Sequence, residues 1–529
     1  MSDRDKAVIE AGASTTDPVA DAPAAVSAPD QGFRMGALGR HSLIYGVGVI
    51  LTKAVSFVML PIYTRFLSPT DYGVLQLITM TLEVVSIFAG SRIAFGIFHY
   101  YHKAEGEDAR RSVLSTALLL LAATYAAAAL AAIAFADPIA RVVFGPGELY
   151  PVYIRLAAAA MAFESLILVP SSLFQLRQRS GYYVGVSLVK LLLQVALNLV
   201  FLVGFEAGVS GVLLSSLISS VLVGGFLAVR VLREVGARFS GSVAREYLRF
   251  GLPLVAVQIA TFIYTFGDRY FLNRAGDEAA VGIYGLAYQF GFLVATMGFA
   301  PFQRVWDPQR FAVAKRVDRD AIYARVFIYL NIGLISASLA LSIFSGDVLR
   351  IIAAPAFHPA IAYVPVIVLA YVFHCWSNFV NLGIYITEKT EYFTAANWAA
   401  AAVALVGYIV LIPEWLAWGA AVATLLSVFT RFWLAYVFSQ RLWRIEYVWG
   451  PVLRMLAVAI AFGAAVALMP RMPLLLSVPV HGAIFGLYLG VMWRGLIGPE
   501  DRAAVRDFIA RKRARGRAPA AAGTAAPGS

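Results

Sequence analysis

The chain has 529 residues, of which 60% are hydrophobic and 14% charged, and its mean hydropathy is +0.75. Soluble domains are roughly 45–50% apolar and about 25% charged, so this composition excludes a soluble globular protein. A net charge of +12 would suggest nucleic acid in a soluble protein, but most of the excess lies between apolar segments, so no nucleic-acid partner is expected. Cys375 is the only cysteine, which excludes an intrachain disulfide and a cysteine-rich metal site. We expect neither a cofactor nor a metal.

Apolar segments recur along almost the whole chain and predict an all-α, polytopic membrane protein with about fourteen transmembrane helices. Crossing a bilayer takes about 20 apolar residues, and stretches such as 112–135 are long enough. In chain order, the predicted spans are 42–63, 74–98, 112–135, 153–173, 183–204, 209–229, 247–272, 281–302, 322–344, 361–386, 393–412, 415–438, 448–469 and 474–492.

The spans divide the chain into five predicted regions. Residues 1–38 are rich in small and polar residues and predict a disordered cytoplasmic leader. Residues 39–246 form an N-terminal six-helix lobe and residues 247–446 a C-terminal six-helix lobe. Two additional transmembrane helices follow in residues 447–497, and residues 498–529 form a basic cytoplasmic tail.

Lysine and arginine are distributed unequally between alternate loops. With the N-terminus inside, the inner segments carry 32 of the 43 cations and the outer loops six, while five lie within spans. Cytoplasmic loops are enriched in these residues. The bias predicts an even number of spans with both termini cytoplasmic.

A weak internal repeat links the first and seventh spans. The first ends in Tyr63-Thr-Arg-Phe-Leu-Ser-Pro-Thr-Asp-Tyr-Gly-Val, and the seventh in Gly267-Asp-Arg-Tyr-Phe-Leu followed by Asp277-Glu-Ala-Ala-Val-Gly-Ile-Tyr-Gly-Leu. Each has an arginine, an acidic turn and then Tyr-Gly opening the next span. Six spans separate the motifs, which predicts two lobes related by an axis along the membrane normal, with the site at their interface. The alternative is convergent loop chemistry, because Tyr and Gly are common at membrane interfaces.

Five cations lie within otherwise apolar spans, where charge is costly and normally faces a partner or a water-filled cavity. They are Lys53, Arg92, Lys190, Arg269 and Arg431. Three of them lie in the first lobe, where they outnumber the mid-depth carboxylates Glu83 and Glu164. A surplus of positive charge suits phosphate or pyrophosphate, through charge-assisted hydrogen bonds.

Polar residues in four spans fall on single helical faces, as expected of helices that line a shared cavity. The faces consist of Lys190, Gln194 and Asn198; of Thr79, Glu83, Ser86 and Gly90; of His374, Asn378 and Asn381; and of Lys53 with Ser56.

A structural explanation stands beside each of these functional interpretations. Glu83 and Glu164 can neutralise buried cations as structural pairs. The His374 face can tie helices together through hydrogen bonds. Arg269 can pair with the adjacent Asp268, and Arg431, predicted nearer the inner face, can extend its head group toward the interface.

The segment from Leu60 to Val74 resembles the signature of the bacterial polysaccharide (O-antigen type) flippases, in the multidrug/oligosaccharidyl-lipid/polysaccharide exporter superfamily. The motifs at 267–272 and 283–288 resemble its second-half counterpart. The resemblance implies a V-shaped, two-lobed carrier that moves an undecaprenyl-pyrophosphate-linked oligosaccharide across the inner membrane. By analogy, Arg65 and Arg269 fall on motif arginines, and the first-lobe cations fit a cationic lumen.

The resulting hypothesis is a flippase that works by alternating access and is not an enzyme. Its predicted substrate-binding residues are Lys53, Arg92, Lys190, Gln194, Asn198 and Arg269, and its candidates for ion coupling are Glu83, Glu164 and His374. The expected partners are the lipid-linked oligosaccharide, membrane lipids, and a polysaccharide polymerase with glycosyltransferases. No GxxxxGK[ST] phosphate loop is present, which argues against direct use of ATP.

Three alternatives remain at this point. A multidrug or metabolite antiporter of the same fold should have an acidic or apolar cavity. A peptidoglycan-precursor flippase differs only in the sugar it recognises. A membrane polysaccharide polymerase or ligase should present a large outer loop with a reactive set of side chains, and no such set stands out.

Overall fold

The computed structural model describes residues 59–90, 93–177, 179–470 and 472–496, and this part of the chain is helical without strands. It contains 12 helices long and apolar enough to span a membrane. One of them is two helices joined at a kink, and counted twice it brings the set into register with predicted spans two to fourteen. The all-α, polytopic fold class is confirmed. The leader 1–38, most of the first span 42–63 and the tail 498–529 lie outside the described residues.

Nine elements make up the first bundle. They are α2 (Pro69–Ala89), α3 (Ile93–Lys103), α4 (Glu107–Ala134), α5 (Ala136–Val143), α6 (Tyr150–Ser165), α7 (Leu168–Leu176), α8 (Ser180–Leu199), the π-helical turn η1 (Val200–Gly204) and α9 (Gly208–Val235). The core between α2, α4, α6 and α9 is built mainly from alanine, leucine and valine.

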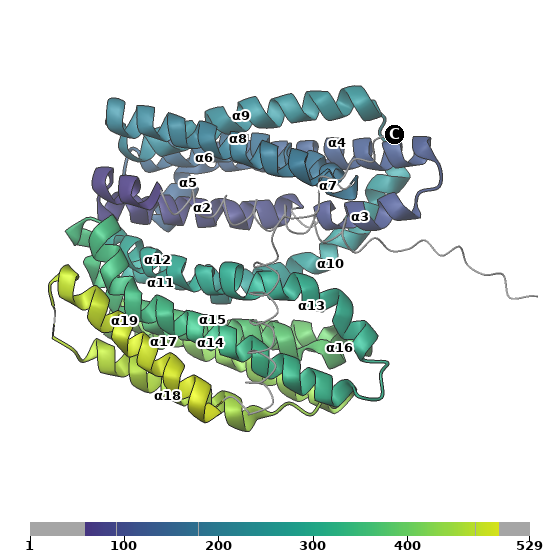
Figure 1. Cartoon of the computed structure of the whole chain (residues 1–529). Helices are drawn as coiled ribbons and strands as arrows, with labels where there is room; N and C mark the ends of the chain where they lie inside the picture. Colours follow the sequence, from purple (N-terminus) through teal and green to yellow (C-terminus); the bar gives the residue numbers. More distant parts are fainter. Residues whose placement is uncertain (1–58, 91–92, 178, 471, 497–529) are drawn as a thin grey trace, which may run out of the picture. The chain divides into compact units, whose positions relative to one another are not determined.

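The second bundle follows and includes the last two spans. Its elements are α10 (Gly241–Phe266), α11 (Asp268–Ala275), α12 (Glu278–Leu293), η2 (Val294–Phe299), α13 (Ala300–Val313), α14 (Arg319–Ile352), the 3-10 helix η3 (Pro355–Ala362), α15 (Val364–Val380), α16 (Leu382–Ile386), α17 (Glu391–Leu442), α18 (Trp449–Ala467), α19 (Leu474–Val491) and η4 (Met492–Leu496). Figure 1 shows the two bundles, with α2 of the first beside α12 of the second.

Helices α2 and α12, which begin within the two repeated motifs, each start after a capping side chain. Ser68 caps α2: its Oγ accepts the N–H of Asp71 at 3.1 Å, and the Asp71 carboxylate accepts the N–H of Ser68 at 3.0 Å. Asp277 caps α12 by accepting the N–H of Ala280 at 2.8 Å. Side chains that satisfy these free N–H groups fix where a helix starts. Position five of each helix is therefore defined, and it is a glycine in both.

Helix α17 contains two predicted spans joined by a sharp reversal at Leu416, whose φ is 47° and ψ −124°. Pro413 lies just before it and cannot donate the helical hydrogen bond. The two arms pack closely: a Cβ on Gly419 would lie 2.1 Å from the carbonyl oxygen of Leu411, and one on Gly407 would lie 2.7 Å from the Cβ of Ala423. Both pairs are nearly symmetric about the kink, so the arms form a helical hairpin.

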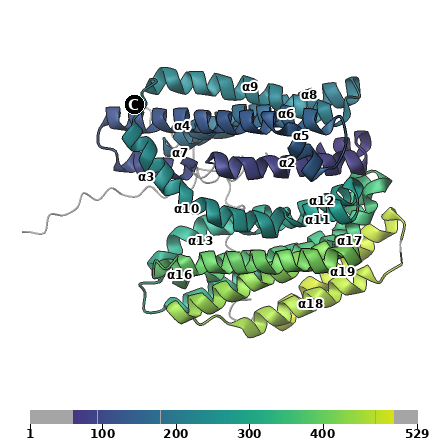
Figure 2. The same cartoon turned by 180° about the vertical axis from the view of Figure 1, so that it is seen from behind.

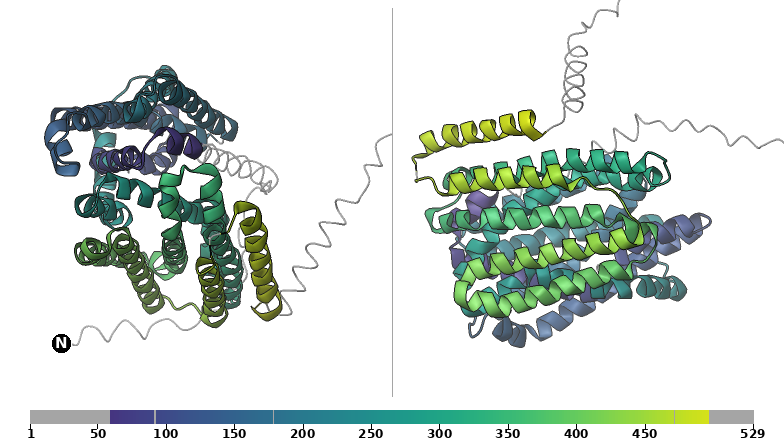
Figure 3. Two further views of the ribbon diagram at one scale, coloured as in Figure 1. Left: turned by 90° about the vertical axis from the view of Figure 1, so that its left-hand side faces the viewer. Right: turned by 90° about the horizontal axis from the view of Figure 1, so that it is seen from below.

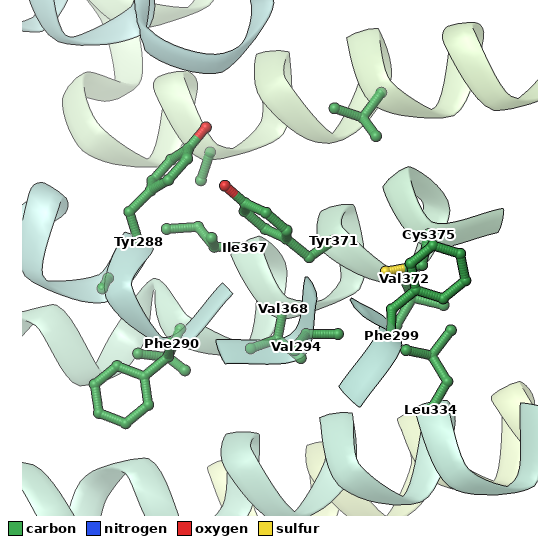
Figure 4. Packing of buried hydrophobic residues seen from close by; sticks show 14 of the residues in the cluster. Tyr288, Phe290, Val294, Phe299, Leu334, Ile367, Val368, Tyr371, Val372 and Cys375 are labelled. Carbon is green, nitrogen blue, oxygen red and sulfur yellow. The ribbon is translucent and has the colours of Figure 1, made fainter. Parts of the chain in front are cut away.

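The second bundle has an aromatic core. Figure 4 shows part of it, where Tyr288 and Phe290 of α12 and Tyr371 of α15 pack with aliphatic side chains. Without a hydrophobic drive between helices in lipid, such close packing is a principal source of stability. Seen end-on and from below, the yellow α18–α19 hairpin lies at the margin of this bundle, and α14 is among its contacts (Figure 3).

Helix α10 belongs to both bundles. Its first half packs on the first bundle, where Gly96 of α3 lies beside the Tyr247 ring and the Tyr100 hydroxyl donates to the carbonyl of Glu246 at 3.0 Å. Its second half packs on α17, where Tyr264 donates to Asn397 at 3.2 Å. Pro253 lies between the two halves. Figure 2 shows α10 running from α3 toward α11.

Candidate functional site

A chamber of about 270 Å³ lies within the first bundle, between α2, α4, α6, α7 and α9. We call it the first-bundle chamber. Its polar lining residues are Thr79, Glu83, Ser86, Tyr125, Glu164, Ser165 and Ser216. Three of them belong to the polar face predicted for span 74–98. A cavity of this size and polarity can hold several water molecules.

Lys190 forms an ion pair with Glu164, across from α8 to α6. The Lys190 side chain is 19% exposed and that of Glu164 55%, so the pair is only partly buried by protein. Glu83 lies in the lining of the same chamber. The other predicted first-lobe cations, Lys53 and Arg92, lie outside the described residues. In the described part of the first bundle, the chamber therefore has a balanced pair and a second carboxylate, and the predicted positive surplus depends on residues beyond that part.

The remaining members of the α8 face, Gln194 and Asn198, are not among the lining residues of the first-bundle chamber. Asn198 is buried and donates its amide to the Tyr63 hydroxyl at 2.8 Å, which ties α8 to the residues that precede α2. Gln194, one helical turn earlier, is half-buried. Of the predicted face, Lys190 is the member that reaches the described chamber lining, through its ion pair with Glu164.

Arg269 lies in a buried network of the second bundle and is 1% exposed. Its guanidinium contacts the Asp268 carboxylate at 3.0 Å and lies 4.0 Å from the centre of the Tyr288 ring. Asp268 also accepts the hydroxyls of Tyr284 at 2.8 Å and Thr424 at 3.2 Å. This geometry matches the local-pair alternative. In this conformation Arg269 has almost no surface to offer a substrate.

Arg431 is 4% exposed, and the expectation that it extends toward the interface is wrong. Its guanidinium donates to the side-chain oxygens of Asn397 and Asn378, both at 2.9 Å, and contacts Nδ1 of His374 at 3.5 Å. The side-chain amide oxygens of Asn397 and Asn378 accept the hydrogen bonds that the Arg431 guanidinium would otherwise make with water or lipid head groups at the membrane surface. The periodicity of a single span does not contain this information.

The polar face of span 361–386 therefore serves mainly to join helices. His374 and Asn378 contact Arg431, and Asn381 accepts a hydrogen bond from buried Arg310 of α13 at 3.2 Å. A proton on His374 would place a second positive charge beside Arg431. His374 is for this reason a weaker candidate for ion coupling than the carboxylates of the first-bundle chamber.

The two bundles meet through a reciprocal glycine contact between α2 and α12. A Cβ on Gly73 would lie 1.7 Å from the carbonyl oxygen of Glu278, and a Cβ on Gly282 would lie 2.0 Å from that of Pro69. Each glycine is the fifth residue of its helix and faces the first residue of the other. Only glycine allows the helix backbones to come this close. We call this pair the glycine contact.

Further contacts join the bundles at the same ends of these helices. Tyr150 donates to Glu278 at 3.3 Å, and Asn273 donates to the carbonyl of Val143 at 2.8 Å. Thr64 donates to the carbonyl of Ile352 at 3.3 Å. Several polar contacts therefore surround the glycine contact and close this end of the interface.

Sequence reasoning missed the glycine contact because it aligned the wrong glycines. The repeated Tyr-Gly pairs Gly73 with Gly285, whereas the helix caps pair Gly73 with Gly282, one turn earlier. The usable signal was the equal distance of each glycine from its capping residue, Ser68 or Asp277. Gly285 instead lies beside the Gln76 side chain.

Structures of known carriers share this fold. A lipid II flippase, MurJ, in an inward closed conformation matches with a TM-score of 0.67 at 10% identity, over 86% of this chain and 100% of that one. An inward-facing multidrug resistance MATE family transporter of the MOP superfamily matches with 0.58 at 14% identity, over 76% and 97%. The MATE multidrug transporter DinF-BH matches with 0.58 at 15% identity, over 78% and 97%. At these identities the likeness concerns the fold alone.

Sequence comparison gives the family. No curated protein sequence matches the chain significantly. The family model described as polysaccharide biosynthesis protein matches residues 38–314, slightly more than half of the chain. That region contains both repeated motifs, the first-bundle chamber and the glycine contact. The chain is a multi-pass membrane protein that belongs to the polysaccharide biosynthesis protein family.

Proposed function

We propose that this protein is a flippase of the bacterial inner membrane. It moves an oligosaccharide carried on undecaprenyl pyrophosphate from the inner to the outer leaflet, for polysaccharide export. Family membership and the carrier fold support this proposal. Glycosyltransferases would build the substrate on the inner side, and a polymerase would use the product on the outer side.

The glycine contact is the observation that carries the transport mechanism. The predicted orientation puts the starts of α2 and α12 on the outer side. Closure there, through equivalent residues of the two repeats, gives a carrier that is shut toward the outside. Repeat-built transporters work by rocking one repeat against the other around a central site. In this proposal the glycine contact separates when the carrier opens outward.

Helix α10 supplies a pivot for that motion. Its two halves are held by different bundles, and Pro253 between them lacks the N–H that would complete the helical ladder. Bending at Pro253 would let the bundles rotate while Tyr247 and Tyr264 keep their respective partners.

The first-bundle chamber is the proposed place for the charged head group. The Lys190–Glu164 pair is partly exposed beside this chamber, so a pyrophosphate can replace Glu164 as the partner of the ammonium group. Lys53, Arg92, Gln194 and Asn198 are proposed to complete the binding site. The released Glu164, together with Glu83, is then proposed to carry the coupling ion. We assign the Arg269 network a structural role, which is to hold the helices of the second bundle together.

One observation favours a second candidate, an antiporter for an organic cation. Two carboxylates, Glu83 and Glu164, are among the lining residues of the described chamber. With the ammonium of Lys190 directed elsewhere, the same chamber would suit a positively charged substrate. The family assignment favours the flippase, and the charge of the occupied chamber distinguishes the two.

The test follows a labelled lipid-linked oligosaccharide in a strain that lacks the gene. Accessibility of the label on the outer leaflet should return with the wild-type protein and fail with a combined Lys53→Ala, Arg92→Ala and Lys190→Ala variant. If this triple variant restores wild-type accessibility of the label, the proposed anion site is refuted. Efflux of a cationic dye, lost on Glu83→Gln, would instead support the antiporter. Using a peptidoglycan-type precursor as the labelled lipid tests the remaining flippase alternative.

A further inference from the structure

A second group of titratable side chains lies far along the chain from the first-bundle chamber, where α19 meets α14. One carboxylate oxygen of Asp347, on α14, forms a hydrogen bond of 2.6 Å with the ring nitrogen Nδ1 of His481. The other oxygen accepts the hydroxyl of Ser477 at 2.6 Å. Ser477 and His481 are one turn apart on α19, and all three side chains are buried. This Asp347–Ser477–His481 cluster fixes the last span to the second bundle.

The cluster borders a large cavity. The cavity measures about 1020 Å³ and is lined by the ends of α14 and α18, the starts of α15 and α19, and η3. Asp347, Ser477 and His481 all line it. Polar groups in a cavity of this size can be reached by water and by protons. The predicted orientation puts this cavity on the outer side, because α14 and α18 end there and α19 begins there.

Three further charged or titratable residues in the described part of the chain, Arg350, His358 and Tyr363, line the cavity. Arg350, one turn after Asp347, lines the cavity and donates to the carbonyl of Met472 at 3.2 Å. His358 and Tyr363 line it from η3 and its end, and His358 contacts the carbonyl of Ala353 at 3.2 Å. The described lining residues of α18 are apolar or glycine. Arg471, between α18 and α19, lies outside the described residues. Among the described lining residues, Asp347 is the one carboxylate.

The pair can hold or release one proton without rearranging its hydrogen bond. With a neutral ring, Nδ1–H donates to the carboxylate and the pair carries one negative charge. With a protonated ring the same bond becomes an ion pair with no net charge. An unbalanced charge at membrane depth is costly, so the two states differ in how firmly they hold α19 against α14.

We propose that Asp347 and His481 form a proton-binding site, open to the outer cavity, that controls how firmly the α18–α19 hairpin is attached. The proton is the ligand, Ser477 positions the carboxylate, and Arg350 supplies the fixed positive charge nearby. The site does not depend on which substrate the carrier moves. It differs from the predicted coupling residues Glu83, Glu164 and His374 in its helices and its access from the outer side.

Proton binding can be measured directly on the full chain in lipid nanodiscs. The protein has six histidines, and histidine-selective ¹⁵N labelling gives a signal for each, with His481 assigned by its loss in His481→Gln. The His481 signal should change as the ring takes up a proton. Asp347→Asn removes the carboxylate that stabilises the protonated ring and should weaken proton binding at least tenfold. The His358 signal is the internal control and should move far less.

A second measurement keeps the proposal falsifiable if Asp347→Asn folds poorly. Ser477→Ala removes one hydrogen bond from the carboxylate but leaves the pair, and should give a smaller shift of the His481 midpoint. Hydrogen exchange in α19, corrected for the intrinsic effect of pH, should differ between pH 6 and pH 8 in the wild type and not in His481→Gln. If the His481 signal does not change with pH, or if neither substitution changes its midpoint, the cluster only holds α19 to α14 and the proposed proton-binding site is refuted. Failure of lipid flipping would leave these results unaffected.

Discussion

The two bundles treat charge in opposite ways. In the first, Lys190 and Glu164 are partly exposed beside the first-bundle chamber, in a bundle whose core consists mainly of small aliphatic residues. In the second, Asp268, Arg269 and Arg431 are at most 4% exposed and each has several partners, within an aromatic core. Buried, hydrogen-bonded charges fix the arrangement of helices, whereas a partly exposed pair can exchange its partner. The Arg269 and Arg431 networks of the second bundle therefore act as a frame, and the proposed substrate site lies in the first bundle.

The largest effect should come from breaking a charge pair in the frame. Asp268→Leu leaves Arg269 buried without its counter-ion, and loss of one partner of a buried pair costs about 3–5 kcal/mol. Unfolding of the purified protein in detergent should report a loss of stability of this order. The double variant Asp268→Leu with Arg269→Met, which removes both charges, should recover most of it. A single variant as stable as the wild type would refute the distinction between the bundles.

The next effect concerns the contact between the bundles. Gly73→Ala places a Cβ 1.7 Å from a backbone oxygen, so the two helices must separate. Flipping should fall about tenfold, equivalent to about 1.4 kcal/mol. A Cys375→Ser, Gln76→Cys background should also gain labelling by an impermeant maleimide from the outer side.

The matched control is Gly225→Ala on α9, where an added Cβ meets nothing within 4 Å. It should leave both flipping and labelling unchanged. Gly282→Ala, the equivalent change in the second repeat, should reproduce Gly73→Ala because the contact is reciprocal. If one of the two glycines tolerates alanine fully, the contact is not a gate.

The same contrast explains what sequence could and could not predict. Apolar segment length depends on neighbours in the chain, so thirteen spans could be predicted. The predicted starts of two of these spans are residues 74 and 281, whereas the caps Ser68 and Asp277 start α2 and α12 several residues earlier. The partners of Arg431 lie 34 and 53 residues away, on other helices, and periodicity along one span cannot identify them. The Lys190–Glu164 pair was among the stated alternatives, but choosing it required knowing that α6 and α8 both pack on α9.

A smaller effect should separate the two candidate substrates. Lys190→Gln should reduce flipping about fivefold, because the head group loses one charge-assisted hydrogen bond worth roughly 1 kcal/mol. Glu164→Gln frees the ammonium group and should preserve binding of the lipid head, although it can slow ion-coupled turnover. Single-turnover flipping measured on both variants distinguishes these steps. Loss of binding with Glu164→Gln and not with Lys190→Gln would point to a cationic substrate.

The smallest effect should come from an ion pair of the first bundle whose residues do not line the first-bundle chamber. Arg155 of α6 and Asp137 of α5 are 2.7 Å apart, but both side chains are about half exposed. Exposed pairs contribute about 0–1 kcal/mol, because water and side-chain entropy offset most of the attraction. Arg155→Ala should therefore leave flipping unchanged and lower the unfolding temperature slightly, with Asp137→Ala as its counterpart. A large loss of flipping in either would mean that solvation alone does not set the role of a charge here, and that the position of α5 against α6 also controls the carrier.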